Sequence, residues 1–163
     1  MPEVIANTSP LQYLFQLGLL HLLPDLYGEV SVPVSVVNEV RSGLAHGVAL
    51  PDLDSLRWLH ICEPRNAAVL PLAASLGAGE REVLALAVES VDPLVILDDA
   101  LARRFAVRLG LRLTGTLGLL LKAKKTGQIE SVRPYLDRLE DLRFRLDGAT
   151  RRGVLTLATE HPG

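Results

Sequence analysis

The sequence predicts an α/β sandwich around a mostly parallel sheet, within one domain spanning residues 1–163. The first observation is that short apolar runs alternate with longer stretches of helical periodicity, as in chains that build parallel sheets. The second is size, because a chain of this length buries roughly 70% of its unfolded surface around one core. The third is composition. Aromatic residues make up only 4% of the chain, so Leu, Val, Ile and Ala must fill that core.

The first expected strand covers residues 3–6, an apolar run that ends at Asn7. A helix should follow, because hydroxyl residues favour the N-cap and proline favours the first helical position. We therefore expect Thr8 or Ser9 to be the N-cap and Pro10 to begin the helix.

Gly18 should end that first helix, and residues 19–23 predict a second helical turn that Pro24 closes. Residues 29–32 predict the second strand. The valines of residues 34–41, which follow a proline, recur at helical spacing and predict a helix with one buried face.

The middle of the chain begins with a segment rich in Gly, Pro and Asp over residues 42–54, which predicts a loop or a loosely held helical arm. Residues 58–62 are a weaker strand candidate, with the end of that arm as the alternative. Residues 80–89 predict a helix, and residues 94–97 are the most apolar strand candidate in the chain. A further helix is expected over residues 100–109. The apolar faces of these two helices should comprise Val83, Leu84, Ala87 and Val88 in the first and Leu101, Phe105 and Leu109 in the second.

The last third predicts one more strand, over residues 111–113, and then only helices. These helices are expected over residues 116–125, 132–142 and 149–158. The first of them ends in three lysines, where cations interact favourably with the helix dipole.

Charge and composition exclude several classes of protein. A single cysteine excludes an internal disulfide and a cysteine-rich zinc site, and four scattered histidines disfavour a histidine-rich metal centre. The longest apolar runs are too short to span a bilayer, and the N-terminus lacks the basic region of a signal peptide. We therefore expect a cytoplasmic protein without membrane association. Residues 1–100 carry 4 basic and 13 acidic residues, whereas residues 101–163 carry 13 and 6.

Oxygen-bearing side chains stand where the expected strands end, at Asn7 and at Asp98 and Asp99, and two further carboxylates lie on helices, at Glu39 and Glu80. Ligands of α/β folds collect beyond the carboxyl ends of the strands. A cluster of hard oxygens there would suit Mg²⁺ or Mn²⁺. Structural readings remain open, because Asn7 could form an Asx turn, an aspartate could be an N-cap, and the glutamates could be solvated or could face a helix dipole.

Four segments of the chain resemble the motifs of the PIN domain superfamily, in the same order. They are residues 4–11 (VIANTSPL), 32–40 (VPVSVVNEV), 76–87 (LGAGEREVLALA) and 95–99 (VILDD). The stretch LRLTGTLG over residues 111–118 and the lysine-rich helix after it are similar to a prokaryotic PIN-like branch related to VapC-type toxins. The resemblance covers roughly residues 2–158.

The resemblance implies a three-layer α/β/α Rossmann-like sandwich and a Mg²⁺- or Mn²⁺-dependent ribonuclease. It also implies a homodimer and a cognate antitoxin as partners. Asn7 falls where PIN domains usually have their first Asp, Glu39 falls on the second acidic position, Glu80 on the third, and Asp98 and Asp99 together on the fourth. Asn7 is neutral, so metal affinity should be lower than in a site anchored by the first Asp. Glu80 departs from the family's usual Asp by one additional methylene.

The remaining residues implied for the site are hydroxyls and cations. Thr8 and Ser9 match the hydroxyl positions beside the first acid and would orient water or phosphate. The cations that would hold the RNA backbone are Arg103, Arg104, Arg108, Lys122, Lys124 and Lys125. The leading hypothesis is therefore an endoribonuclease that is the toxin of a toxin–antitoxin pair. The alternatives are an inactive PIN-like module that binds RNA or protein and, more remotely, a protein that binds a small molecule.

Overall fold

The computed structural model describes residues 3–66 and 74–161 of the chain. It falls into two compact units, residues 1–115 and residues 116–163. The first unit contains a parallel sheet with its helices, and the second contains three helices. The prediction that the whole chain is one domain stays a prediction.

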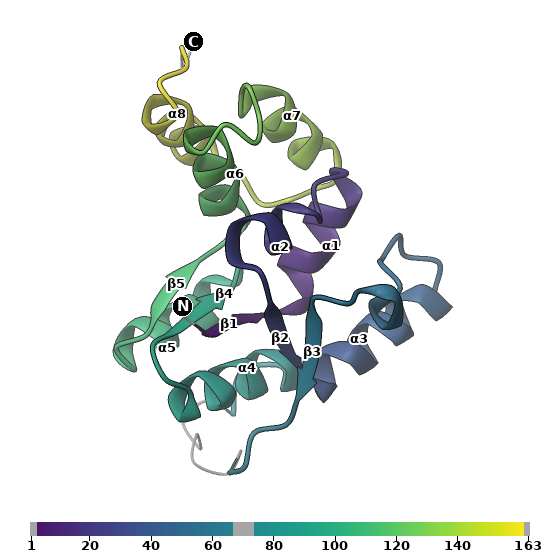
Figure 1. Cartoon of the computed structure of the whole chain (residues 1–163). Coiled ribbons are helices and arrows are strands. Elements are labelled where there is room, and N and C mark those ends of the chain that lie inside the picture. The colour runs from purple at the N-terminus through teal and green to yellow at the C-terminus, as the bar shows by residue number, and fades with distance from the viewer. Residues whose placement is uncertain (1–2, 67–73, 162–163) are drawn as a thin grey trace. The chain divides into compact units, whose positions relative to one another are not determined.

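The first unit alternates strands and helices, as the sequence predicts (Figure 1). Its strands are β1 (Glu3–Ala6), β2 (Val30–Pro33), β3 (Leu59–Cys62), β4 (Pro93–Ile96) and β5 (Arg112–Thr114). Its helices are α1 (Thr8–Gln16), α2 (Leu22–Tyr27), α3 (Val34–Ala45), the 3₁₀ turn η1 (Leu53–Ser55), α4 (Ala78–Glu89) and α5 (Ala100–Arg108).

The sheet has the strand order β3-β2-β1-β4-β5, and all four pairings are parallel. β1 lies at the centre, where Val4 and Ile5 are buried, and it pairs with β4 from Glu3 opposite Pro93 to Ala6 opposite Ile96. The chain leaves β1 toward β2 on one side and later returns to β4 on the other. The strand order therefore reverses between β1 and β4. Open α/β sheets bind ligands beyond the carboxyl ends of the strands at such a switch point.

Helices flank the sheet. α4 packs against β1, β2 and β4, α5 packs against β5, and α2 packs against β2. Figure 1 shows α4 below the strands and α1 and α2 above them. The predicted α/β fold with a parallel central sheet between helical layers is thus confirmed.

Several helix boundaries differ from those predicted. α1 begins at Thr8 with Asn7 as its N-cap, so neither Thr8 nor Ser9 is the cap. Pro24 does not close a helix but lies in the first turn of α2, where its missing N–H breaks no helical hydrogen bond. α3 continues to Ala45, four residues into the segment for which a loop or a loosely held helical arm is predicted, so the helical alternative holds for these four residues.

Two predicted helix faces are also partly wrong. Val88 on α4 is largely exposed, although Val83, Leu84 and Ala87 are buried as expected. In α5 the fully buried residues are Ala102 and Ala106, whereas Leu109 is exposed. Small residues let a helix approach its sheet closely, and this leaves the larger side chains at the margin of the contact.

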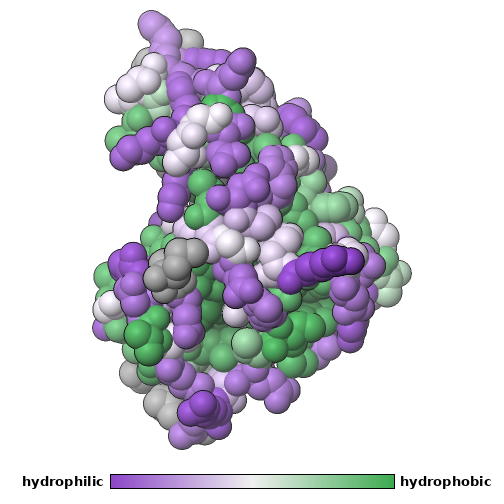
Figure 2. All heavy atoms as spheres, viewed as in Figure 1, coloured by the Kyte–Doolittle hydropathy of each residue, from purple (hydrophilic) through white to green (hydrophobic). Residues whose placement is uncertain are grey.

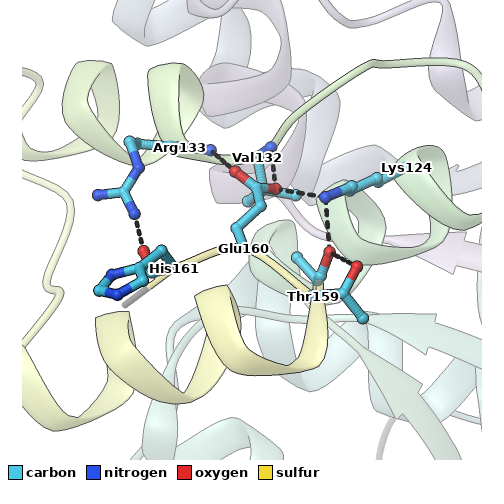
Figure 3. Close-up of polar contacts among 7 residues, drawn as sticks. Lys124, Val132, Arg133, Thr159, Glu160 and His161 are labelled. Atoms are coloured by element: carbon cyan, nitrogen blue, oxygen red, sulfur yellow. Dashed lines mark hydrogen bonds and ion pairs between the residues drawn. The ribbon is translucent and has the colours of Figure 1, made fainter. Parts of the chain in front are cut away.

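The second unit contains α6 (Thr116–Lys125), α7 (Arg133–Asp141) and α8 (Gly148–Leu157). Its buried side chains come from all three helices and include Leu119, Leu136 and Leu155. Beyond α8, the Glu160 carboxylate connects the C-terminal segment to α6 and to the start of α7. It accepts hydrogen bonds from Lys124 Nζ at 3.0 Å and from the backbone N–H groups of Val132 and Arg133 at 2.7 and 3.1 Å (Figure 3). We call these four residues the C-terminal latch.

The surface is mixed in character. Green and purple residues are interspersed over the visible face of the first unit (Figure 2). The larger exposed apolar side chains in this unit include Ile61, Val91 and Val107. Within residues 3–66 and 74–161, no helix combines the length and the apolar character needed to cross a bilayer.

Candidate functional site

The carboxyl ends of β1 and β4 bring two of the predicted segments side by side. Ala6 pairs with Ile96, and the backbone N–H of Asn7 donates to the Ile96 carbonyl at 3.1 Å. Asn7 follows β1 directly, and Asp98 and Asp99 lie two and three residues beyond the end of β4. The sheet register therefore places the first and fourth predicted motifs at one edge, which we call the acidic edge.

Asn7 has an unusual environment for an amide. The residue is only 4% exposed, and its side-chain Oδ1 has no hydrogen-bond partner among the described residues. It does not form the Asx turn considered from the sequence, because no side-chain capping bond is made. An unsatisfied buried oxygen costs about 1–3 kcal/mol, and such a group in a native fold calls for a ligand or another explanation.

Glu39 is held at the acidic edge by two other elements. Its Oε2 accepts a hydrogen bond from the Thr8 hydroxyl at 2.5 Å, and its Oε1 accepts one from the Gly79 backbone N–H at 3.1 Å. A Cβ at position 79 would lie 2.6 Å from Glu39 Oε1. A glycine in the first turn of α4 is therefore what lets this carboxylate approach the helix.

Glu80 lies beside Gly79, in the first turn of α4. Its Oε2 accepts a hydrogen bond from the Gly77 backbone N–H at 3.0 Å. Burial raises the pKa of the Glu80 carboxyl above its ordinary value, the Gly77 bond lowers it in part, and the carboxylates of Asp99 and Glu39 raise it further. Glu80 is therefore close enough to both carboxylates to feel their negative charge.

The two adjacent aspartates have different surroundings. Asp99 is the N-cap of α5, and its Oδ2 accepts the Ala102 backbone N–H at 2.9 Å. Asp98 lies against Gly115, where a Cβ would come within 2.7 Å of its Oδ1. Burial, and then the charge of Asp98, raise the pKa of the Tyr13 hydroxyl on α1, so this phenol lies within electrostatic range of Asp98.

The predicted hydroxyls and cations are distributed differently. Thr8 orients Glu39, whereas Ser9 makes no side-chain hydrogen bond with the described residues. Arg103 donates from its Nη1 to the Leu97 carbonyl at 2.8 Å, and is therefore engaged within the first unit. Arg104 and Arg108 are exposed on α5.

The three predicted lysines belong to the second unit. Lys124 is paired with Glu160 in the C-terminal latch, and its side chain is only 22% exposed. Lys122 and Lys125 are exposed on α6.

Sequence reasoning missed the residues that shape the site without bearing its charge. Gly79 and Gly115 give room to Glu39 and Asp98, and Tyr13 lies near Asp98. A glycine directly before Glu80 was a usable signal, because glycine inside a helix is unfavourable unless something approaches its backbone. The position of Tyr13 depends on how α1 packs, which no local pattern reveals.

A family described as a PIN domain matches residues 3–160. The chain belongs to the PIN domain family. No curated protein matches the chain. The match covers nearly all of the chain, as the motifs indicate. PIN domains are generally nucleases, and they typically use divalent metal ions.

The acidic edge of this PIN domain fits a divalent ion by its donor chemistry. Every predicted ligand offers oxygen, Asn7 holds a buried oxygen without a partner, and Glu80 experiences the repulsion of two carboxylates that a cation would relieve. In the described part of the chain, no three His, Cys, Asp or Glu side chains converge on a single point. Mg²⁺ is commonly held by only one or two carboxylates together with water, so two acids and the Asn7 oxygen suffice.

Proposed function

We propose that this PIN domain is a divalent-metal-dependent endoribonuclease that hydrolyses RNA phosphodiester bonds. The observation that supports it most directly is the buried, unpartnered Oδ1 of Asn7 at an edge shared with Glu39, Glu80, Asp98 and Asp99. A bound Mg²⁺ or Mn²⁺ supplies Lewis-acid activation and neutralises charge that develops on the phosphate.

Each residue has a role in this proposal. Asn7 would hold the ion together with Asp98 or Asp99, which follow the ends of β1 and β4. Glu39 is oriented by its hydrogen bonds from the Thr8 hydroxyl and the Gly79 backbone N–H. Glu80 completes the acidic wall from α4.

The test is cleavage of a mixed cellular RNA pool by the purified protein with Mn²⁺, with Mg²⁺ and with EDTA. The variant is Asp98→Asn/Asp99→Asn, which removes two charges but keeps a good helix cap at position 99, since Asn caps helices as well as Asp does. We expect metal-dependent cleavage by the parent and a loss of at least about 100-fold in the variant.

The matched control is Asp92→Asn. Asp92 directly precedes the first residue of β4, at the end of the strand away from the acidic edge, and forms an exposed ion pair with Arg112. Its backbone φ is 49°, a conformation that Asn adopts readily. This variant should cleave like the parent. Equal cleavage by the parent and the double variant would remove the proposed site.

A second candidate function is a PIN module that binds RNA without cleaving it. Two observations favour it: the first position of the site is neutral Asn7, and no three acids of the described residues converge on one point. RNA binding that EDTA leaves unchanged, together with no cleavage by folded protein, would support this candidate.

We further propose that the protein is the toxin of a toxin–antitoxin pair and that it forms a homodimer. The resemblance to VapC-type toxins supports both. Expression in a bacterial host should stop growth, and Asp98→Asn/Asp99→Asn should restore it. The mass in solution tests the dimer, and a small protein that co-purifies and relieves the arrest would be the antitoxin.

A further inference from the structure

A groove of about 590 Å³ runs along one face of α3 and borders the acidic edge. Its volume falls in the range of about 300–1,000 Å³ that is usual for ligand sites. We call it the α3 groove. Its lining residues are Ser35, Asn38, Glu39, Ser42, Gly43, His46 and Ala78. Glu39 thus belongs to both the groove and the acidic edge, so a substrate bound at that edge can extend into the groove.

The groove offers neutral hydrogen-bonding groups that the fold does not use. The side chains of Asn38 and Ser42 make no hydrogen bond with the described residues. His46 has its Nδ1 2.8 Å from the Ser42 carbonyl oxygen. Because a carbonyl only accepts, this contact fixes the proton of a neutral ring on Nδ1 and leaves Nε2 as an acceptor.

Ser35 differs from these residues because its hydroxyl is already engaged. It donates to Glu82 Oε2 at 2.6 Å, and the backbone N–H of Ser35 points to the same oxygen at 3.3 Å. Glu82 on α4 thereby holds the first turn of α3, which fixes the wall of the groove. The groups left for a ligand are those of Asn38, Ser42 and His46.

This chemistry suits a nucleobase better than a phosphate. No Lys or Arg is among the lining residues, and the Glu39 carboxylate repels anions. An amide presents one donor and one acceptor to a base edge, and an imidazole ring provides a flat surface on which an unpaired base stacks.

We propose that the α3 groove is a nucleobase subsite, in which Asn38 and His46 hold one unpaired base of single-stranded RNA beside the phosphodiester at the acidic edge. The proposal rests on the proposed function for its substrate class. Asn38 reads the edge of the base, His46 stacks on its face, and Ser42 holds the ring of His46 through its carbonyl.

The first test measures binding of single-stranded RNA hexamers (A₆, C₆ and U₆) to the full chain in EDTA, beside an abasic ribose-phosphate hexamer. We expect at least one base-bearing hexamer to bind more tightly than the abasic one and to shift the NMR signals of the Asn38 amide. Asn38→Ala and His46→Ala should each weaken that binding by at least about fivefold.

His46→Phe keeps a stacking surface and should restore most of the binding lost in His46→Ala. Leu44→Ala is the matched control, because Leu44 is an exposed residue of α3 that does not line the groove. Equal binding of the abasic and base-bearing hexamers, or equal binding by all variants, would overturn the proposal.

The second test separates this proposal from the proposed function. If the parent cleaves RNA, the bases that flank its cleavage positions should change in Asn38→Ala and His46→Ala but not in Leu44→Ala. Cleavage with unchanged base preference would overturn the subsite and leave the nuclease standing. Base-dependent binding without cleavage would support the subsite and overturn the proposed nuclease activity.

Discussion

At the scale of single residues, Glu80 is held in the site against electrostatic repulsion. Its pKa is raised by burial and by two neighbouring carboxylates, although the Gly77 N–H stabilises its charged form. A raised pKa means that the folded state holds the proton more tightly than the unfolded state, whose value is 4.5. The stability that protonated Glu80 contributes to the folded state is therefore fully present below pH 4.5. It is lost as the pH rises through the pKa of Glu80 in the folded state.

Glu80→Gln should therefore stabilise the metal-free protein at pH 7 and leave its stability unchanged well below pH 4.5. The gain should be about 1 kcal/mol or less, because the group is half-buried and water screens its charge. Denaturant unfolding in EDTA measures it, with Glu3→Gln at the opposite end of the sheet as the control.

Adding Mn²⁺ should reverse the order of the parent and Glu80→Gln, because the parent gains a ligand charge that the variant lacks. A variant that is less stable than the parent in EDTA would show that the Gly77 hydrogen bond outweighs the repulsion.

At the scale of elements, the first turn of α4 lies in close contact with the Glu39 carboxylate at Gly79. Gly79→Ala would put a Cβ 2.6 Å from the Glu39 carboxylate, which is the flexible end of its side chain. The carboxylate should swing away and lose its bond to the backbone N–H of residue 79. Alanine also favours the helix by about 0.5–1 kcal/mol, so the free energy of unfolding should change little.

The expected result for Gly79→Ala is near-normal stability with RNA cleavage reduced at least about tenfold. Gly153→Ala is the matched control, since a Cβ at that position in α8 would meet nothing within 4 Å. It should leave cleavage unchanged. A Gly79→Ala variant with full activity would show that the position of Glu39 is unimportant.

The C-terminal latch is a second element-scale feature that can be tested. Burial alone would raise the pKa of Glu160, but the N–H of Val132, the Lys124 ammonium and the N–H of Arg133 lower it overall. The stability that Glu160 contributes is therefore present above its unfolded pKa of 4.5 and is lost as the pH falls through the lower folded value.

Glu160→Gln should lower the free energy of unfolding at pH 7 by about 1–3 kcal/mol, because charged hydrogen bonds are exchanged for neutral ones. Its stability should also fall less steeply in acid than that of the parent. Glu130→Gln, an exposed acid in the same unit, should match the parent. An unchanged midpoint in Glu160→Gln would mean that the latch contributes no net stability.

Local patterns predicted the elements well where one signal dominates. The range of α6 matches its prediction at both ends, and that of α5 differs by one residue. Patterns failed where tertiary contact decides. Asn7 caps α1 through its backbone conformation alone, because its buried side chain makes no capping bond. The candidate site followed from strand ends, but the roles of Gly79 and Tyr13 depend on long-range packing.

At the scale of the whole molecule, the second unit can be tested for its ability to fold without the first. Residues 116–163 form a compact unit of three short helices. A core below roughly 70–80 residues seldom supplies more than about 3–5 kcal/mol. We therefore expect a peptide of residues 116–163 to show weak, gradually melting helicity by circular dichroism, whereas the full chain unfolds cooperatively.

A cooperative melting transition in that peptide would contradict the prediction that the chain is a single domain. The C-terminal latch lies wholly within this peptide, so Glu160→Gln provides an internal control there. If the peptide folds, this substitution should lower its melting temperature, and if it does not fold, the substitution should have no effect.

The strand order also has a consequence for how the chain is made. β1 is synthesised before its partner β4, which begins only at Pro93. At about 5–20 residues per second, translation needs on the order of 5–20 s to supply that partner. During this interval the side of β1 that later pairs with β4 is without its neighbour. The acidic edge forms only once β4 pairs with β1, so the nascent chain cannot carry an assembled site before then.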